Sequence, residues 1–314
     1  MKLSKAFEGF ILYAKGGKYS PTYTPTIEGI LKFMLSYFGD RELESLTLED
    51  WQKYFYHLRY EHVPRRFNKD VSPLAESTID NHWKLIRSFY NWASDILSIN
   101  RPDLRLPRPK YDTPQIVPFT QDEVKRLLDA CQFTQVEKKD GKRYKIKRPN
   151  ADRDKAILMI LLDTGIRLGE LCRLRIGDVN LENGEVYIRP YHDGRKSKSR
   201  TVFLGQRTRQ VVWKYIAKQQ SQQDQTLQLF ELKSSTIRIQ VGRIGANAKV
   251  THAHPHKFRH TFAITYLRNN GDIFTLQRLL GHATLEMTKR YLDISQVDLA
   301  TTHARASPVD NWKL

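Results

Sequence analysis

The sequence predicts a mainly α-helical fold with a small antiparallel β-sheet, arranged in two domains. Apolar residues recur at helical spacing along most of the chain, which has 314 residues and is 40% hydrophobic. Residues 185–204 change to short strand-like runs around a polar turn. A proline-rich segment separates two helical regions. At about 150 residues per domain, we expect an N-terminal helical domain at 1–105, a linker at 106–118 and a second domain at 119–314.

The N-terminal domain is expected to consist of helices with buried aromatic stripes. Apolar residues between Thr26 and Phe38 follow the i, i+3, i+4, i+7 spacing of one buried face. Thr47 fits the N-cap of a second helix, and Ser77 fits the N-cap of a long third helix. We expect these stripes to form a core; base stacking by Trp83 or Trp92 is the alternative.

The charge of the chain indicates a polyanionic partner. The formal net charge is +18 and the sequence pI is about 9.8, so nucleic acid is the simplest partner. A merely soluble basic protein or a ribosomal protein is the alternative. The chain has 5 Trp, 15 Tyr and 14 Phe, which indicates that its basic residues lie on a folded body.

The domain boundary, residues 101–118, combines prolines with basic residues. It is preceded and followed by helical patterns, and its five prolines between residues 101 and 118 disfavour helix and favour an extended, semi-rigid tether. Its four basic residues either follow a phosphate backbone or are solvated; they are Arg101, Arg105, Arg108 and Lys110.

The second domain is expected to open with a capping box at Thr120 and Glu123. Residues 137–153 form a charged insertion, either a surface loop or ribbon that contacts DNA or a solvated excursion. The two strands are expected at 185–189 and 201–204. Further helices are expected at 157–162, 168–174, 207–217, after His256, at 272–280 with Gly281 as its end, and after a cap at Thr284.

Neither a membrane span nor a signal peptide is apparent. No run approaches about 18 apolar residues, and the N-terminal apolar patch lacks a small-residue cleavage site. Two cysteines, Cys131 and Cys172, give no disulfide framework. We therefore expect a protein of the reducing cytoplasm.

Two stretches concentrate groups suited to charge and proton transfer on one phosphate. Residues 164–174 read TGIRLGELCRL and place Arg167 after a Thr-Gly turn, with Glu170 one helical turn later. Residues 256–291 contain a His-x-x-Arg motif, a Leu-Gly-His motif and a tyrosine nine residues after the latter; the polar groups are His256, Arg259, His282 and Tyr291.

These four motifs, in this order and at these spacings, closely resemble those of tyrosine recombinases, the family of phage integrases and Xer-type recombinases. The resemblance covers residues 118–292 firmly and the N-terminal part loosely. It implies a core-binding domain followed by a catalytic domain, in a site-specific DNA recombinase associated with the nucleoid of a prokaryote or with a mobile element. It also implies that Tyr291 forms a 3′-phosphotyrosyl link and that strands are exchanged through a Holliday junction.

The residue types fit phosphodiester cleavage without metal or ATP. Forked guanidinium donors such as those of Arg167 and Arg259 suit the two non-bridging oxygens. A tyrosyl phosphate retains the energy of the broken bond, so no cofactor is expected. Tyr266 is the main competing tyrosine, and its apolar neighbours indicate packing.

The remaining polar residues have less specific roles. The resemblance assigns His256 and His282 to hydrogen bonding of the phosphate or to proton transfer, and which of them acts as base stays open. His260 is expected to be supportive. Glu170 either orients Arg167 or a neighbouring His, or forms an ordinary ion pair.

The general acid is expected in the turn between the two strands. The family places a Lys there, but an ungapped alignment from Arg200 puts Arg195 at that position. Because an Arg hardly releases a proton near neutral pH, we assign Lys196, with Lys198 second.

No metal site is expected. The four histidines between residues 252 and 260 lack a Cys or acidic partner and a recognised ligand spacing. The residues after Tyr291 end in an apolar tail with Trp312, and the resemblance implies that it docks onto a neighbouring protomer; folding onto its own domain is the alternative. The expected partners are double-stranded DNA target sites and three further copies of the chain, as a homo-tetramer on two sites. An accessory directionality factor is a further candidate, and no membrane is involved.

Two other functions remain open. A type IB topoisomerase or a telomere resolvase uses similar Tyr, Arg and His groups. A non-enzymatic DNA-binding protein on the same fold is the other alternative.

Overall fold

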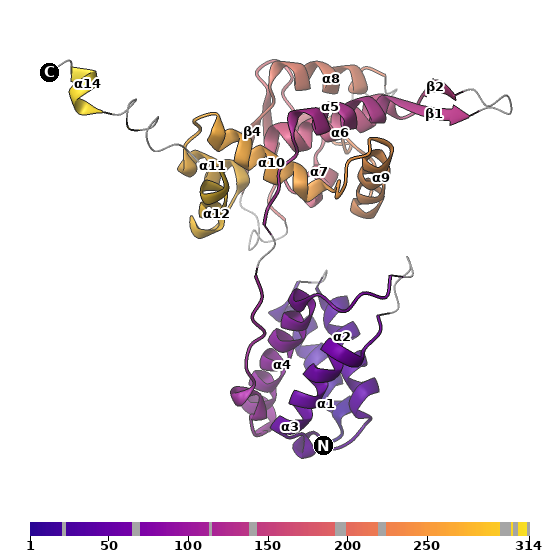
Figure 1. Cartoon of the computed structure of the whole chain (residues 1–314), viewed down its shortest axis with the longest axis vertical. Helices are drawn as coiled ribbons and strands as arrows, with labels where there is room; N and C mark the ends of the chain where they lie inside the picture. Colours follow the sequence, from indigo (N-terminus) through magenta and orange to yellow (C-terminus); the bar gives the residue numbers. More distant parts are fainter. Residues whose placement is uncertain are drawn as a thin grey trace. The chain divides into compact units, whose positions relative to one another are not determined.

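A computed structural model describes most of the chain, in two compact units, Met1–Pro114 and Gln115–Leu314. The described residues are 1–20, 23–64, 70–112, 115–137, 143–191, 199–218, 224–295, 303 and 307–312. The predicted class, mainly helical with small antiparallel sheets, is confirmed (Figure 1). None of the described helices combines the length and apolar character needed to cross a membrane.

Unit 1 is a helical body with an aromatic core. Its α-helices in the described part are α1 (Leu3–Tyr13), α2 (Thr24–Phe38), α3 (Leu48–Tyr56) and α4 (Glu76–Leu97). Short turns extend or connect them: η1 (Ala14–Lys18), η2 (Leu43–Ser45), η3 (His57–Glu61) and η4 (Pro102–Arg105). Helix α1 was not predicted, although it buries Phe7 and Phe10 against the other helices.

Two predicted caps in unit 1 have different outcomes. Thr47 caps α3 in a capping box with Asp50, as predicted. Ser77 is not an N-cap, because α4 begins two residues earlier than predicted, at Glu76, with Ala75 as its N-cap. Trp92 is 8% exposed, and Trp83 donates from Nε1 to the Leu106 carbonyl, so both belong to the core, as predicted.

Most of the proline-rich segment is attached to unit 1. Arg101 forms an ion pair with the buried Asp103, and Arg108 donates from Nε and Nη2 to both oxygens of Asp80. Two of its four basic residues are therefore neutralised by carboxylates. Just after the segment, the Phe119 amide donates to the Thr261 hydroxyl within unit 2.

Unit 2 surrounds the central helix α6 (Ala151–Thr164), which packs against α5 (Gln121–Gln132), α8 (Gln206–Ile216) and α10 (Pro255–Arg268) (Figure 1). The capping box at Thr120 and Glu123 is confirmed. The other elements are α7 (Leu168–Arg173), η5 (Ile176–Asp178), α9 (Ser234–Asn247), α11 (Ile273–Leu280), α12 (Glu286–Ser295) and α14 (Pro308–Trp312). Helix α9 was not predicted.

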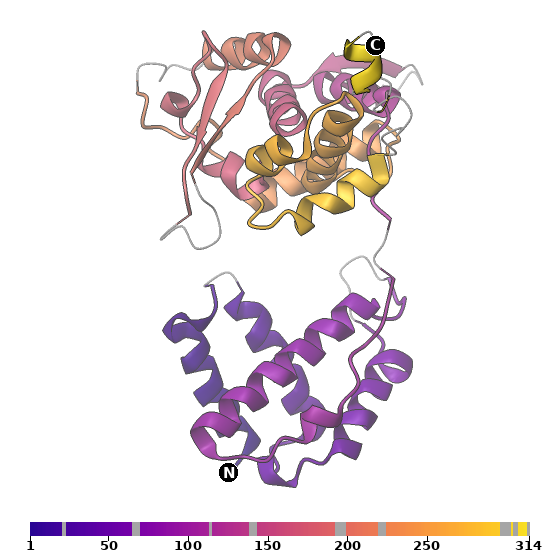
Figure 2. The same cartoon turned by 90° about the vertical axis from the view of Figure 1, so that its left-hand side faces the viewer.

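Two antiparallel hairpins complete unit 2. A ribbon begins just before the predicted charged insertion and extends into it: β1 (Phe133–Glu137) pairs with β2 (Arg143–Lys147). The predicted strands are β3 (Glu185–Ile188) and β4 (Arg200–Phe203), and Val186 and Val202 form a buried pair. This second hairpin forms one flank of the unit (Figure 2). Its turn, residues 192–198, lies outside the described residues.

Candidate active site

The first part of the site lies where α6 ends and α7 begins. Gly165 terminates α6 with φ +61°, and a Cβ there would lie 2.4 Å from the Phe262 ring. Both the backbone conformation and the close packing therefore require glycine at this position. Arg167 is the N-cap of α7, and its amide donates to Glu170 Oε2 at 2.8 Å. Its Nη1 donates to Glu170 Oε1 and its Nη2 to the Gly281 carbonyl, both at 3.2 Å. The side chain stays 34% exposed.

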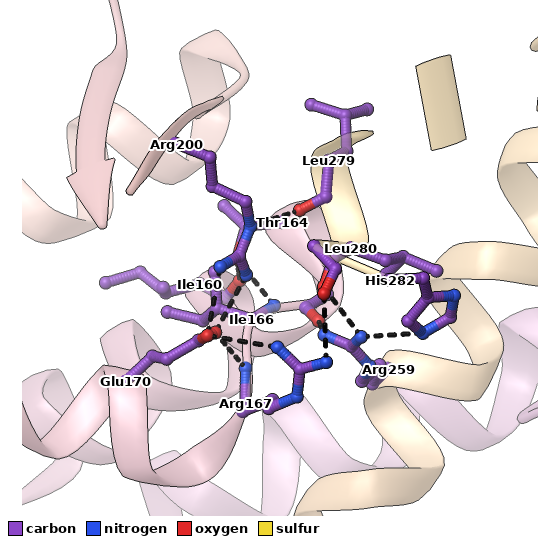
Figure 3. A network of polar contacts seen from close by, with 12 residues as sticks. Ile160, Thr164, Ile166, Arg167, Glu170, Arg200, Arg259, Leu279, Leu280 and His282 are labelled. Carbon is purple, nitrogen blue, oxygen red and sulfur yellow. Dashed lines mark hydrogen bonds and ion pairs between the residues drawn. The ribbon is translucent and has the colours of Figure 1, made fainter. Parts of the chain in front are cut away.

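Arg200, the first residue of β4, is a member of this network that sequence reasoning missed. Its Nη1 and Nη2 donate to the two oxygens of Glu170 at 2.9 and 2.8 Å, and its Nε donates to the Leu279 carbonyl at 2.7 Å. Its side chain is 8% exposed. Glu170 therefore binds two arginines, Arg167 and Arg200 (Figure 3). A strand residue next to a polar turn gives no sequence signal for burial.

Arg259, on α10, is buried at the centre of the site. Its Nη1 donates to the Gly165 carbonyl at 2.7 Å, and its Nη2 donates to the Leu280 carbonyl at 2.8 Å and lies 2.9 Å from His282 Nε2 (Figure 3). It is 2% exposed. The main chain at the end of α6 and at the end of α11 is thus joined through one guanidinium.

His282 and Tyr291 lie beside this guanidinium. Gly281 ends α11 with φ +63°, as the sequence predicted, and turns the chain so that His282 faces Arg259. His282 Nδ1 lies 2.9 Å from the Thr288 hydroxyl on α12. Because Nε2 accepts from Arg259, the proton of the neutral ring sits on Nδ1 and is donated to Thr288. The rings of His282 and Tyr291 are stacked at 6.2 Å.

Tyr291 is 3% exposed, and its hydroxyl lies 2.9 Å from His260 Nδ1. The His256 ring contacts the His260 ring edge-on at 4.3 Å. The structure thus brings together every predicted polar residue that it describes: Arg167, Glu170, His256, Arg259, His260, His282 and Tyr291. Lys196 and Lys198 lie outside the described residues.

The surroundings shift the pKa values of these groups. Burial opposes ionisation of Glu170, but the hydrogen bonds and charge of Arg200, with those of Arg167, outweigh it and lower its pKa to about 2. Burial, together with repulsion from Arg167, lowers the pKa of Arg259 to about 10. Burial and the nearby arginines lower the pKa of His282 to about 4, and burial and His256 lower that of His260 to about 3.

Burial also raises the pKa of the Tyr291 phenol, although Arg259 and Arg290 oppose the shift. At neutral pH the site therefore holds three arginine cations, one carboxylate, neutral histidines and a protonated phenol. This surplus of positive charge is suited to binding an anion with fixed guanidinium donors. Arg167 is its partly open side, whereas Arg259 and Tyr291 are covered.

Two polar residues near the site have local structural contacts. Tyr266 packs against Phe262 and lies directly over Gly271, where a Cβ would be 2.1 Å from its ring, so it has the packing role expected. His254 Nδ1 accepts from the Lys257 amide and caps α10. Within the described part of the chain, no group of three His, Cys, Asp or Glu side chains is arranged to hold a metal ion.

Comparison with known proteins gives one family and several relatives. Residues 118–297 match the model described as the phage integrase family. The tyrosine recombinase XerA of Saccharolobus solfataricus is 26% identical over 306 residues, 97% of this chain and 92% of the relative. The tyrosine recombinase XerC of Staphylococcus epidermidis is 30% identical over 246 residues, 75% of this chain and 77% of the relative.

Among solved structures, the Tn1549 transposon integrase in complex with a circular-intermediate DNA aligns with a TM-score of 0.70. The sequence identity is 18%, and the alignment covers 93% of this chain and 95% of the other. At this identity the likeness shows a shared fold.

Proposed function

The chain belongs to the phage integrase family, and we propose that it is a site-specific DNA recombinase that cleaves and rejoins duplex DNA through a tyrosyl phosphate. The observation that carries this proposal is the convergence of Arg167, Arg259 and Tyr291 with His282 from α7, α10, α12 and the turn after α11. The names of the relatives, tyrosine recombinases XerA and XerC, support it.

In this mechanism the two arginines hold the scissile phosphate. Arg167 and Arg259 donate to its non-bridging oxygens, whose charge grows as phosphorus becomes five-coordinate. Glu170 and the main-chain carbonyls of Gly165, Leu280 and Gly281 fix the two guanidinium groups before the substrate arrives. Preorganised donors of this kind stabilise the transition state without reorganising during the reaction.

Tyr291 is the proposed nucleophile. Its oxygen forms a bond to phosphorus as the bond to the 5′ oxygen breaks, and its proton passes to a neighbouring imidazole, of which His260 lies within hydrogen-bonding distance of the phenol in this arrangement. The 5′ oxygen takes a proton from the turn between β3 and β4, for which Lys196, then Lys198, remain the predicted donors. Because Tyr291 is 3% exposed, α12 must shift before the phenol reaches a phosphate.

The proposed substrate is a pair of double-stranded DNA sites. Each duplex would be held between the N-terminal helical domain, residues 1–105, and the catalytic domain, residues 119–314. Four copies of the chain would exchange strands through a Holliday junction, with the C-terminal tail docked on a neighbour and an accessory protein setting direction. The related integrase fold that was solved with circular-intermediate DNA supports a DNA substrate.

The test is covalent capture on a library of nicked duplexes with random cores. The short strand diffuses away after cleavage, so a phosphotyrosyl adduct accumulates and survives denaturation. We expect adducts with the wild-type chain and with Tyr266→Phe, and none with Tyr291→Phe. Sequencing the captured DNA would give the target site.

Three results would contradict the proposal in different ways. A mobility shift without adduct would indicate a DNA-binding protein. Relaxation of any supercoiled plasmid without recombinant product would indicate a topoisomerase. An adduct that persists in Tyr291→Phe would move the nucleophile elsewhere.

A further inference from the structure

We infer that Arg200 is a positioning residue for strand cleavage, because it holds the Glu170 carboxylate and thereby keeps Arg167 free to bind the phosphate. This inference rests on the proposed function and extends it to a residue outside the motifs. Arg200 touches none of the groups proposed to react; it acts through Glu170 and through the main chain before His282.

The contacts of Arg200 join three elements of unit 2. It lies at the start of β4, its forked nitrogens bond Glu170 on α7, and its Nε bonds the Leu279 carbonyl near the end of α11 (Figure 3). Gly281 packs against it so closely that a Cβ there would lie 3.1 Å from Arg200 Nη1. One side chain therefore sets the distance between α7, which carries Arg167, and the turn that carries His282.

The charge balance explains why Glu170 needs this partner. Glu170 is 4% exposed, so its carboxylate must be bonded inside the protein. Arg200 supplies the shorter side-chain bonds, at 2.8 and 2.9 Å, whereas Arg167 Nη1 lies at 3.2 Å. Without Arg200, the carboxylate would draw the Arg167 guanidinium into a tight pair, and fewer of its donors would face a phosphate.

Arginine is needed at this position for its shape. A guanidinium presents donors along fixed directions in one plane, and here three of its nitrogens have separate acceptors. A lysine ammonium carries the same charge on one nitrogen and cannot reach both Glu170 oxygens and the Leu279 carbonyl together. Arg200→Lys therefore retains the charge and loses the geometry.

The hairpin offers a matched control. Arg189 follows β3 and donates from Nε and Nη2 to Asp178 Oδ1, an arginine–carboxylate pair of the same hairpin that lies outside the reactive cluster. If Arg200 only stabilised the hairpin, Arg189→Lys would have a similar effect on activity. If it positions the clamp, only Arg200→Lys slows cleavage.

The experiment measures single-turnover adduct formation on the captured nicked duplex at saturating protein, with DNA affinity and thermal unfolding of each variant. We expect Arg200→Lys to slow cleavage about 10²-fold, the cost of a small misplacement of a catalytic group, with DNA affinity nearly unchanged. Arg189→Lys should cleave like the wild type.

A second variant separates positioning from stability. If Arg200 acts through Glu170, the double variant Arg200→Lys/Glu170→Gln should be no slower than the slower single variant, because both changes break one unit. The inference would be overturned if the rate reductions of the two single variants multiplied in the double variant, or if Arg189→Lys slowed cleavage as much as Arg200→Lys. Either result would leave the recombinase assignment intact. Absence of any Tyr291-dependent adduct in the wild type would overturn both.

Discussion

The two units of the chain differ most in how they use positive charge. Unit 1, residues 1–114, has 17 Lys and Arg against 14 Asp and Glu, a formal charge of +3. Unit 2, residues 115–314, has 35 against 20, a formal charge of +15. Nearly all the surplus that indicates a polyanionic partner therefore belongs to the unit with the candidate active site.

The arginines show the same difference at the level of single contacts. In unit 1, Arg59, Arg101 and Arg108 each bond a carboxylate, those of Glu76, Asp103 and Asp80. In the site of unit 2, three arginines lie around Glu170 alone, and Arg259 bonds main-chain carbonyls instead of an anion. An arginine that is held by main-chain carbonyls keeps its charge available for a phosphate. An arginine that is paired with a carboxylate stabilises the folded structure instead.

The largest effect that follows from this comparison is expected at Arg259. Arg259→Lys should slow covalent adduct formation by about 10²- to 10³-fold, as for loss of one preorganised donor. The burial that lowers the pKa of Arg259 to about 10 would lower that of a lysine further, so the replacement would also lose charge near neutral pH.

The corresponding variant in unit 1 is Arg108→Lys, which disturbs an arginine that donates to both oxygens of Asp80. Its adduct rate should equal that of the wild type at saturating protein. If the two variants lost the same activity, Arg259 would stabilise the folded structure as Arg108 does, and the proposed difference between the arginines of the two units would be wrong.

The site could be predicted from sequence as far as its motifs are local. The Thr-Gly turn before Arg167, Gly281 before His282, and the spacing from His282 to Tyr291 are short-range features, and the structure brings all these residues together. Helix caps at Thr47 and Thr120 depend on neighbouring residues only and were also correct. The catalytic roles of these residues stay predictions.

The missed features depend on contacts between distant segments. Arg200 meets Glu170 and Leu279 only after folding, so its burial has no local signal. Helix α9 buries Ile237, Val241 and Ile244 in the core of unit 2, and its glycines and polar residues weaken the helical pattern. The covered state of Tyr291 is likewise a property of the packed α12.

A smaller effect is expected from pH, because both units bury neutral histidines. Burial lowers the pKa of His82 in unit 1 to about 4, and those of His282 and His260 in unit 2 to about 4 and 3. Between about pH 6.5 and 4 the unfolded chain binds protons that these folded residues do not, so the free energy of unfolding falls as pH falls. The pKa values of His62 in unit 1 and of His254 and His256 in unit 2 are lowered as well, so unit 2, with more such groups, should lose more stability than unit 1.

Hydrogen exchange read by mass spectrometry between pH 7.5 and 5, corrected for the intrinsic exchange rate, would follow the two units separately. We expect protection in α10–α12 to decrease before that in α3 and α4. Earlier loss in unit 1 would show that His82, rather than the histidines of the site, limits acid stability.

The smallest effect concerns the salt dependence of DNA binding. Arg238 is exposed on α9, has no carboxylate partner in the described part of the chain, and lies near enough to His254 to help lower its pKa. It is therefore a candidate phosphate contact beside the site. Arg238→Gln should make the slope of log affinity against log salt shallower by about 0.9. Between 50 and 200 mM salt, the variant should therefore lose roughly threefold less affinity than the wild type.

Lys53 in unit 1 is the control, because it is also exposed but pairs with Glu49 at 2.8 Å. Lys53→Gln should leave the slope unchanged. Because Lys53 is paired with a carboxylate, we expect that it neutralises no phosphate and therefore releases no counterion from DNA on binding. If the slope changed equally in both variants, paired cations of unit 1 would also contact the phosphate backbone. The formal charge of each unit would then not predict its contribution to DNA binding.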